Sequence, residues 1–136
     1  MKKFLFMFVA LIAMTLAANA TDFYDANYKG TVSNVVMGGA SKADANGILF
    51  TVENAIITGD FDVPGTSPVH HIDMDGMFTT ATTPFTIPVS GDVTVKGRKV
   101  AYSGTIYVTE YTATTLKFDF SCPTLQASFT FDGVAQ

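Results

Sequence analysis

Apolar and polar residues alternate along much of the chain. From residue 116 to residue 120, a leucine and two phenylalanines alternate with a lysine and an aspartate. From 125 to 131, four apolar residues alternate with glutamine, serine and threonine, and the segment 100–108 places two valines, a tyrosine and an isoleucine on one face. A period of two residues puts every second side chain on the same side of an extended strand. The pattern therefore predicts β-strands with one apolar face.

Turn-forming residues divide the chain into short strands, because glycine, proline and asparagine favour the backbone angles of turns. The breaks fall at Asp44–Gly47, Pro64–Pro68, Ser90–Asp92, Lys96–Arg98 and Cys122–Pro123. The predicted strands span residues 28–36, 47–53, 55–63, 69–79, 84–89, 92–96, 98–109 and 114–133, the last of them broken in two near Cys122. Joining 84–96 into one kinked strand keeps the total at eight.

The absence of any segment with a helical period decides between architectures. Each predicted strand has an apolar face that must be buried, and no helix is predicted to cover it. The sheet must therefore close on itself or pack against a second sheet. The connections are short, which favours antiparallel neighbours, and closure removes unpaired strand edges. We therefore predict an all-β, eight-stranded antiparallel up-and-down barrel, with a two-sheet β-sandwich as the alternative.

The first twenty residues have the three parts of a secretory signal peptide: a positive start at Lys2 and Lys3, an apolar run, and a small-residue cleavage site ending at Ala20. The apolar run is about 14 residues long, whereas a membrane-spanning helix needs about 20. We expect cleavage after Ala20, export to the periplasm or the extracellular space, and no membrane span after cleavage. Residues 21–136 then form a single domain.

Charge and cysteine content narrow the function classes. The 136-residue chain has 8 Lys and Arg against 12 Asp and Glu, so removing Lys2 and Lys3 leaves a net charge of 6 − 12 = −6. A negatively charged chain repels the phosphate backbone of nucleic acids, so we expect no nucleic-acid partner. A single cysteine excludes an internal disulfide framework.

Three short motifs resemble those of the bacterial calycin-like family, small secreted β-barrels related to lipocalins. They are Tyr-x-Gly-Thr-Val at Tyr28–Val32, Ile-Asp-Met-Asp-Gly-Met at Ile72–Met77, and Phe-x-Phe-x-Gly at Phe129–Gly133. The resemblance spans nearly all of the chain after residue 20. It implies a barrel fold and supplies no catalytic residues.

The apolar face of the predicted barrel supplies a candidate ligand-binding surface. An eight-stranded barrel is just wide enough to be filled by side chains or to hold one small ligand, so both a filled core and a ligand cavity stay open. The side chains expected to converge inside are Phe61, Phe85, Ile87, Tyr102, Ile106, Phe118, Phe120, Phe129 and Phe131.

The segment Val69–Gly76 contains the densest group of metal-ligand residue types. On a strand, His71, Asp73 and Asp75 share one face, and histidine with carboxylates suits zinc or another divalent ion. Further ligands would have to come from Asp60 or Asp62 on a neighbouring strand. The simpler interpretation is a solvated surface ion pair of His71 with Asp73, and we expect no metal and no cofactor.

Alternation along the predicted strands also indicates which face His70 and Cys122 occupy. His70 shares a face with Ile72 and Met74, and Cys122 shares the apolar face of Phe120. A nucleophilic cysteine needs a nearby cation or helix N-terminus, and the sequence predicts neither. We interpret Cys122 as a small buried hydrophobic residue.

The sequence therefore predicts an exported, non-enzymatic binding module. No hydrolase elbow, phosphate-binding loop or zincin motif is present. One hypothesis is that the barrel binds a small apolar or amphipathic ligand. The alternative is a protein- or glycan-interaction module with a filled core, in which Tyr107 and Tyr111 form an exposed contact surface.

Overall fold

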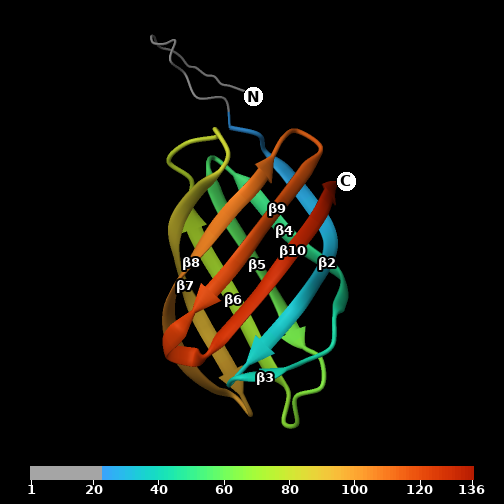
Figure 1. Cartoon of the computed structure of the whole chain (residues 1–136), viewed down its shortest axis with the longest axis vertical. Coiled ribbons are helices and arrows are strands. Elements are labelled where there is room, and N and C mark those ends of the chain that lie inside the picture. Colours follow the sequence, from blue (N-terminus) through green and yellow to red (C-terminus); the bar gives the residue numbers. More distant parts are fainter. Residues whose placement is uncertain (1–22) are drawn as a thin grey trace.

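A computed structural model describes residues 23–136, so the predicted signal peptide lies outside the described residues. The described chain is a closed barrel of long, tilted antiparallel strands (Figure 1). Its elements are β2 (Ala26–Met37), β3 (Ala40–Ser41), β4 (Ala45–Glu53), β5 (Ile56–Val63), β6 (His70–Met77), β7 (Phe85–Val95), β8 (Arg98–Tyr111), β9 (Thr115–Cys122), the 3-10 turn η1 (Pro123–Leu125) and β10 (Ala127–Ala135).

The strands follow one another around the barrel in chain order. Each long strand from β4 to β10 pairs with the next, and β2 pairs with β4 on one side and β10 on the other. The pairing of β10 with β2 closes the cylinder, and the two-residue strand β3 adds only a short hairpin to the end of β2. The predicted eight-stranded up-and-down barrel is confirmed, and the sandwich alternative is not adopted.

Two of the tight hairpins have the backbone geometry that their twist requires. Asn54 and Ala55 join β4 to β5, and Lys96 and Gly97 join β7 to β8, with positive φ at all four residues. Two-residue hairpins favour such turns because their twist matches that of the flanking strands. The predicted break at Lys96–Arg98 is therefore a reversal of the chain.

Other predicted breaks lie inside strands. The single strand β7 spans Phe85–Val95, so the prediction of one kinked strand over 84–96 is confirmed and the break at Ser90–Asp92 is not. Asn46 and Gly47 were predicted as a turn but lie within β4, where the pairing with β2 shifts register. A second irregularity in β2 surrounds Asn34, which has a φ of 52°. These bulges bend the strands without ending them.

Phenylalanine rings fill the middle of the barrel. The ring of Phe50 lies 4.7 Å from that of Phe131 and 5.2 Å from that of Phe118, centroid to centroid, and Phe129 stacks on Phe120 at 4.7 Å. These distances are those of closely packed aromatic pairs. The middle of the barrel is therefore a packed core.

The barrel end near the C-terminus is closed by a second aromatic cluster. The ring of Tyr111 contacts those of Phe78, Tyr24 and Tyr28 at centroid distances of 4.9, 5.3 and 6.5 Å. Its hydroxyl accepts a hydrogen bond from the amide of Tyr24 and donates one to the carbonyl oxygen of the same residue. This cluster ties the segment before β2 across the end of the barrel.

Burial keeps the phenols of this end protonated. The hydroxyl of Tyr28 donates to the carbonyl oxygen of Thr112 at 2.7 Å. Burial, assisted by the neighbouring Tyr24 and Asp25, raises the pKa of Tyr28 to about 12. The cluster is thus a structural plug whose hydrogen bonds persist over the ordinary pH range.

Within residues 23–136, no helix is long and apolar enough to cross a bilayer.

Candidate functional site

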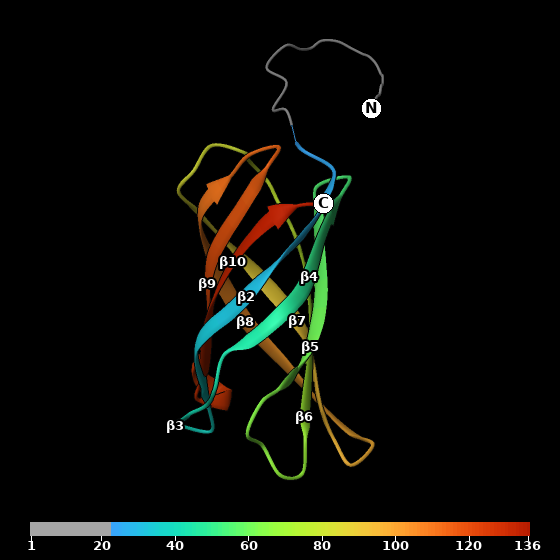
Figure 2. The same cartoon turned by 90° about the vertical axis from the view of Figure 1, so that its right-hand side faces the viewer.

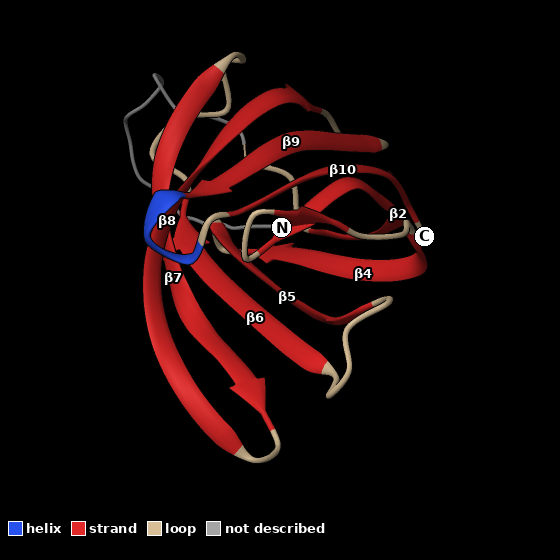
Figure 3. Cartoon of the chain, turned by 60° about the horizontal axis from the view of Figure 1, so that its bottom comes forward, coloured by secondary structure: helices blue, strands red, loops and turns tan. Residues whose placement is uncertain are grey.

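The opposite end of the barrel is bordered by four connections. They are the turn between β2 and β3, the loop of residues 64–69 between β5 and β6, the β7–β8 hairpin and η1 (Figure 2). We call this the open end. Figure 3, in which it comes forward, shows η1 and the hairpin at its border. No residue of the aromatic plug reaches it, because the plug occupies the other end.

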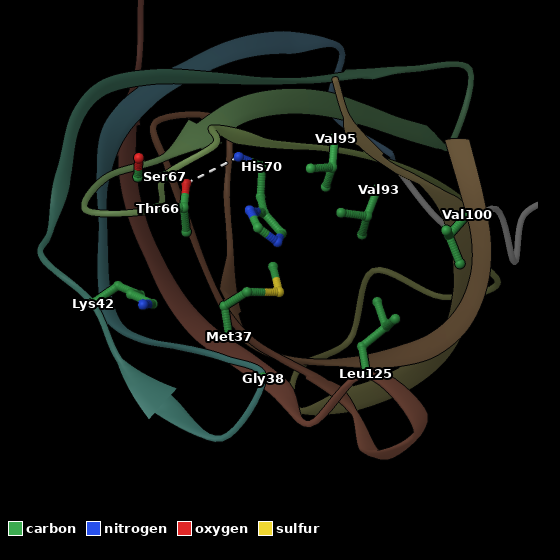
Figure 4. Close-up of a pocket in the computed structure, with 10 residues that line it drawn as sticks. All are labelled: Met37, Gly38, Lys42, Thr66, Ser67, His70, Val93, Val95, Val100 and Leu125. Atoms are coloured by element: carbon green, nitrogen blue, oxygen red, sulfur yellow. Dashed lines mark hydrogen bonds between the residues drawn. The ribbon is translucent and has the colours of Figure 1, made fainter. Parts of the chain in front are cut away.

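A pocket of about 380 Å³ lies at the open end. It draws on almost every element that borders this end, and its walls combine apolar side chains with a few polar groups. The lining residues are Met37, Gly38, Lys42, Thr66, Ser67, His70, Val93, Val95, Val100 and Leu125. Figure 4 shows them arranged around the cavity.

The two sides of the pocket differ in chemistry. Val93, Val95, Val100 and Leu125 lie on one side in Figure 4, and the polar residues lie mainly on the other. The side chain of Met37 points into the cavity between them. A pocket with an apolar side and a small number of placed polar groups is typical of small-molecule sites.

Backbone and side-chain hydrogen bonds hold His70 in place. Its amide donates to the hydroxyl of Thr66 at 2.9 Å, and that hydroxyl donates to the carbonyl oxygen of Val63 at 2.7 Å. The imidazole Nδ1 lies 3.0 Å from the carbonyl oxygen of Pro68. Because a carbonyl oxygen only accepts, Nδ1 carries the proton of this bond. The other ring nitrogen, Nε2, is left for a ligand.

Hydrogen bonds also hold the β2–β3 turn and Lys42 at the rim of the open end. The amide of Gly39 donates to the carbonyl oxygen of Gln126 at 3.0 Å, which joins this turn to the residue after η1. The amide of Lys42 donates to the carbonyl oxygen of Val35 at 2.7 Å. The rim is thus largely pre-formed, which lowers the entropic cost of binding.

The nine side chains predicted to bind a ligand inside the barrel are all buried, as their alternation indicated. None of them lines the pocket at the open end. Eight of the nine are at most 5% exposed, and Phe85 is 9% exposed. The structure places them in the packed interior, and their part in ligand binding stays a prediction.

The predicted metal residues separate in the structure. His71 reaches across to the neighbouring strand, with Nδ1 at 2.7 Å from Asp62 Oδ1 and Nε2 at 3.0 Å from Asp60 Oδ2. The predicted ion pair of His71 with Asp73 is wrong, because the carboxylate of Asp73 instead accepts a hydrogen bond from the amide of Asp92 at 2.9 Å, and Asp75 is exposed. In the part of the chain that the structure describes, no three His, Cys, Asp or Glu residues are arranged to hold a metal ion.

The two carboxylates beside His71 favour its charged form. The hydrogen bond to Asp62, assisted by Asp60, raises the pKa of His71 above the ordinary value of 6.5, against a smaller opposing effect of burial. The ion pair therefore stabilises the fold below that ordinary value, and its contribution is lost as the pH rises through the higher folded-state pKa. All three side chains are at least 38% exposed, so solvent screens the interaction.

We expect His71→Gln to lower the free energy of unfolding by at most about 1 kcal/mol near pH 5.5, and by less near pH 9. The measurement is urea unfolding of wild type and variant at both pH values. Replacing Asp60 and Asp62 together by asparagine should remove most of this pH dependence. A deficit that grows at alkaline pH would contradict the assignment.

Cys122 is fully buried, in agreement with its interpretation as a small core residue. Its thiol donates to the carbonyl oxygen of Ser103 at 3.4 Å. Among the described residues its thiol forms no hydrogen bond with a histidine, and it does not line the pocket.

The predicted tyrosine contact surface is wrong for one of its two members. Tyr107 is 45% exposed on the outer wall of β8, but Tyr111 is only 4% exposed. A register shift in the pairing of β8 with β9, between Val108 and Glu110, interrupts simple alternation and lets Tyr111 point inward. Tyr107 alone does not make a patch.

Sequence reasoning missed the pocket because its residues are scattered over the chain. Two sequence features lie at the open end: the Pro64–Pro68 break, and His70, which alternation places on the same face as Ile72 and Met74. Lys42 lies in a short connection that the alternation pattern does not orient, and Leu125, which the pattern placed at the start of a strand, lies in η1.

Comparison of the chain with protein-family models, with curated proteins and with solved structures gave no match in any of the three. The resemblance to calycin-like barrels is therefore a prediction from short motifs, and the barrel itself is what the structure establishes.

Proposed function

We propose that this chain is an exported, non-enzymatic binding module that takes a small apolar or amphipathic ligand in the pocket at the open end of its barrel. The observation that carries the proposal is the cavity of about 380 Å³ with four aliphatic side chains along one side. Ligand pockets commonly measure about 300–1,000 Å³ and are lined mostly by apolar groups.

The packed interior supports binding at the end of the barrel rather than along its axis. The rings of Phe50, Phe118 and Phe131 lie within 5.4 Å of one another, centroid to centroid. A ligand along the axis would have to displace these rings and create the corresponding cavity. At the open end the space already exists.

The hydrogen bonds of the pocket support a binding role rather than a catalytic one. The hydroxyl of Thr66 is engaged by the carbonyl oxygen of Val63 and the amide of His70, rather than by the imidazole. A nucleophilic hydroxyl needs a base within hydrogen-bond reach. The arrangement positions the loop and leaves the imidazole Nε2 for recognition.

Export and family membership form part of the same proposal. The signal-peptide pattern of residues 1–20 supports secretion to the periplasm or beyond. The up-and-down barrel is compatible with a small secreted calycin-like protein, with the three motifs supporting that family.

Val100→Asp tests the pocket at little cost to the fold, because Val100 is already 56% exposed. We expect the variant to bind the neutral fluorescent probe phenylnaphthylamine at least about tenfold more weakly than wild type, since a carboxylate in the apolar wall must be desolvated when the probe binds. Fluorescence titration measures the dissociation constant.

Val134→Asp is the matched control, because Val134 is 53% exposed on β10 and does not line the pocket. It should bind the probe as wild type does. Equal probe affinity in all three proteins, or no saturable binding to wild type, would refute the proposed function.

A further inference from the structure

We infer that the open-end pocket selects an amphipathic anion, whose apolar part lies on the valine side and whose negative group lies near Lys42 and His70. The inference rests on the proposed function and adds the charge and orientation of the ligand. It joins three observations: the position of the cations, the two-sided lining of the pocket, and the hydrogen bonding of His70.

The cations of the described chain are concentrated at the open end. From residue 23 onward the chain has six Lys and Arg residues, and four of them lie there. Lys42 lines the pocket, and Lys96, Arg98 and Lys99 occupy the tip of the β7–β8 hairpin. This concentration occurs in a chain whose net charge after residue 20 is 6 − 12 = −6. A local positive potential at one end of an acidic protein attracts anions to that end.

The four cations lack carboxylate partners within 4 Å among residues 23–136, whereas Lys117 on the outer wall pairs with Asp132 at 3.7 Å. Asp60 and Asp62 contact His71 on the outside of the barrel, and Asp44, two residues after Lys42, is exposed and forms no ion pair with these cations. The positive charge of the rim is therefore available to a ligand.

The hairpin presents part of this charge toward the pocket. Arg98 pairs directly with Val95, which lines the cavity. Directly opposed residues of an antiparallel pair project from the same face of the sheet, so Arg98 belongs to the pocket-facing side of the hairpin. It lies at the outer border, beyond Val100.

Inside the pocket, polar groups converge on one side. Lys42 supplies a positive charge, and the imidazole of His70 stands in the cavity opposite Met37 in Figure 4. The bond from Nδ1 to the carbonyl oxygen of Pro68 fixes the ring and leaves Nε2 uncommitted. An anionic group between Lys42 and His70 would receive a charge-assisted hydrogen bond from the Lys42 ammonium, and Nε2 of His70 would donate a second one in the imidazolium form.

Other ligand classes fit this arrangement less well. A purely apolar ligand would remove water from Lys42 without replacing its hydrogen bonds, which is unfavourable. A cationic amphiphile would meet like charge from Lys42 and the hairpin. The volume of about 380 Å³ limits the apolar part to one medium-length chain or a compact ring system rather than a two-chain lipid.

The test compares three ligands with the same ten-carbon tail, namely decanoate, decanol and decyltrimethylammonium, each below its micellar concentration. They compete with bound phenylnaphthylamine on the purified protein. We expect decanoate to bind at least about tenfold more tightly than decyltrimethylammonium, with decanol between them. Lys42→Glu should weaken decanoate by at least about tenfold and leave decanol within about twofold.

Lys29→Glu is the control for net charge, because Lys29 is exposed on β2 and does not line the pocket. It should change no affinity by more than about twofold. Lys42→Gln gives a second variant that removes the charge without reversing it, and it should lose an intermediate share of the decanoate affinity. Cooperative thermal unfolding of each variant establishes that the barrel is intact.

The outcomes separate the inference from the proposed function. If decanol binds as tightly as decanoate, or if Lys42→Glu leaves the preference unchanged, the pocket binds ligands without selecting anions and the inference is overturned. If none of the three ligands displaces the probe, both fail. Binding confined to phosphatidylglycerol vesicles, without binding of monomeric decanoate, would assign the cations to a membrane surface and overturn the inference.

Discussion

Gly30→Ala is expected to lower the free energy of unfolding by at least about 3 kcal/mol, because it introduces a side chain at the seam that closes the barrel. Gly30 on β2 pairs with Gly133 on β10. A Cβ atom at Gly30 would overlap the carbonyl oxygen of Asp132 and approach the Cα of Gly133 to 2.5 Å. These are backbone atoms, so the strain can be relieved only by separating the two strands.

Urea unfolding followed by circular dichroism measures the effect, and Gly97→Ala is the control. Gly97 has a φ of 77° in the β7–β8 turn, and an added Cβ would meet nothing within 4 Å. Its substitution should cost only about 1–2 kcal/mol, the penalty of a left-handed conformation for a residue with a side chain. Equal stability losses in the two variants would contradict the close approach of β2 and β10.

The seam also matters to the pocket. Met37 lies at the end of β2, and the Gly39–Gln126 hydrogen bond joins the following turn to the start of β10. Separation of the two strands would move the wall that contains Met37 away from the wall that contains Leu125. We therefore expect probe affinity in Gly30→Ala to fall together with stability.

The period-two pattern predicted the barrel well because each strand has one buried face. In β9 and β10, Phe118, Phe120, Phe129 and Phe131 all point inward, as their alternation with polar residues requires. The same logic predicted eight strands and antiparallel order. This part of the fold depends on local sequence together with the need to bury apolar surface.

Alternation predicted the wrong side-chain orientation where a strand has a local irregularity. In β2, Val32 and Val35 are both buried although they are three positions apart, because a bulge at Asn34 changes the side from which later residues project. The inward position of Tyr111 follows another register shift. Such shifts depend on pairing with strands distant in sequence, so alternation along one strand does not reveal them.

The pocket could not be predicted from the sequence for a related reason. Its size depends on where the barrel stops being filled, and that depends on how far the phenylalanine core extends along the axis. His71 illustrates what strand pairing adds: the sequence offered Asp60 or Asp62 only as further metal ligands and Asp73 as the ion-pair partner, whereas in the structure Asp60 and Asp62 both form the ion pair with His71.

Phe118→Ala should distinguish the packed core from the binding site, because we expect it to cost about 3–5 kcal/mol of stability while changing probe affinity by less than about twofold. Phe118 is 1% exposed, and its ring lies 5.2 Å from that of Phe50 and 5.4 Å from that of Phe131. Removing the ring leaves a cavity among side chains that can relax only partly. None of these three residues lines the pocket.

Because domains of this size are stable by only about 5–15 kcal/mol, Phe118→Leu gives a milder second variant if the alanine variant does not fold cooperatively. Tyr107→Ala is the control on the outer wall, where Tyr107 is 45% exposed, and it should cost less than about 1 kcal/mol. Urea unfolding and phenylnaphthylamine titration are measured on all three variants.

If a folded Phe118 variant lost tenfold in probe affinity, the ligand would bind among the phenylalanines of the barrel interior, and the open-end pocket would be the wrong site. If the affinity survives the loss of stability, the phenylalanines support the barrel and the residues at its open end bind the ligand.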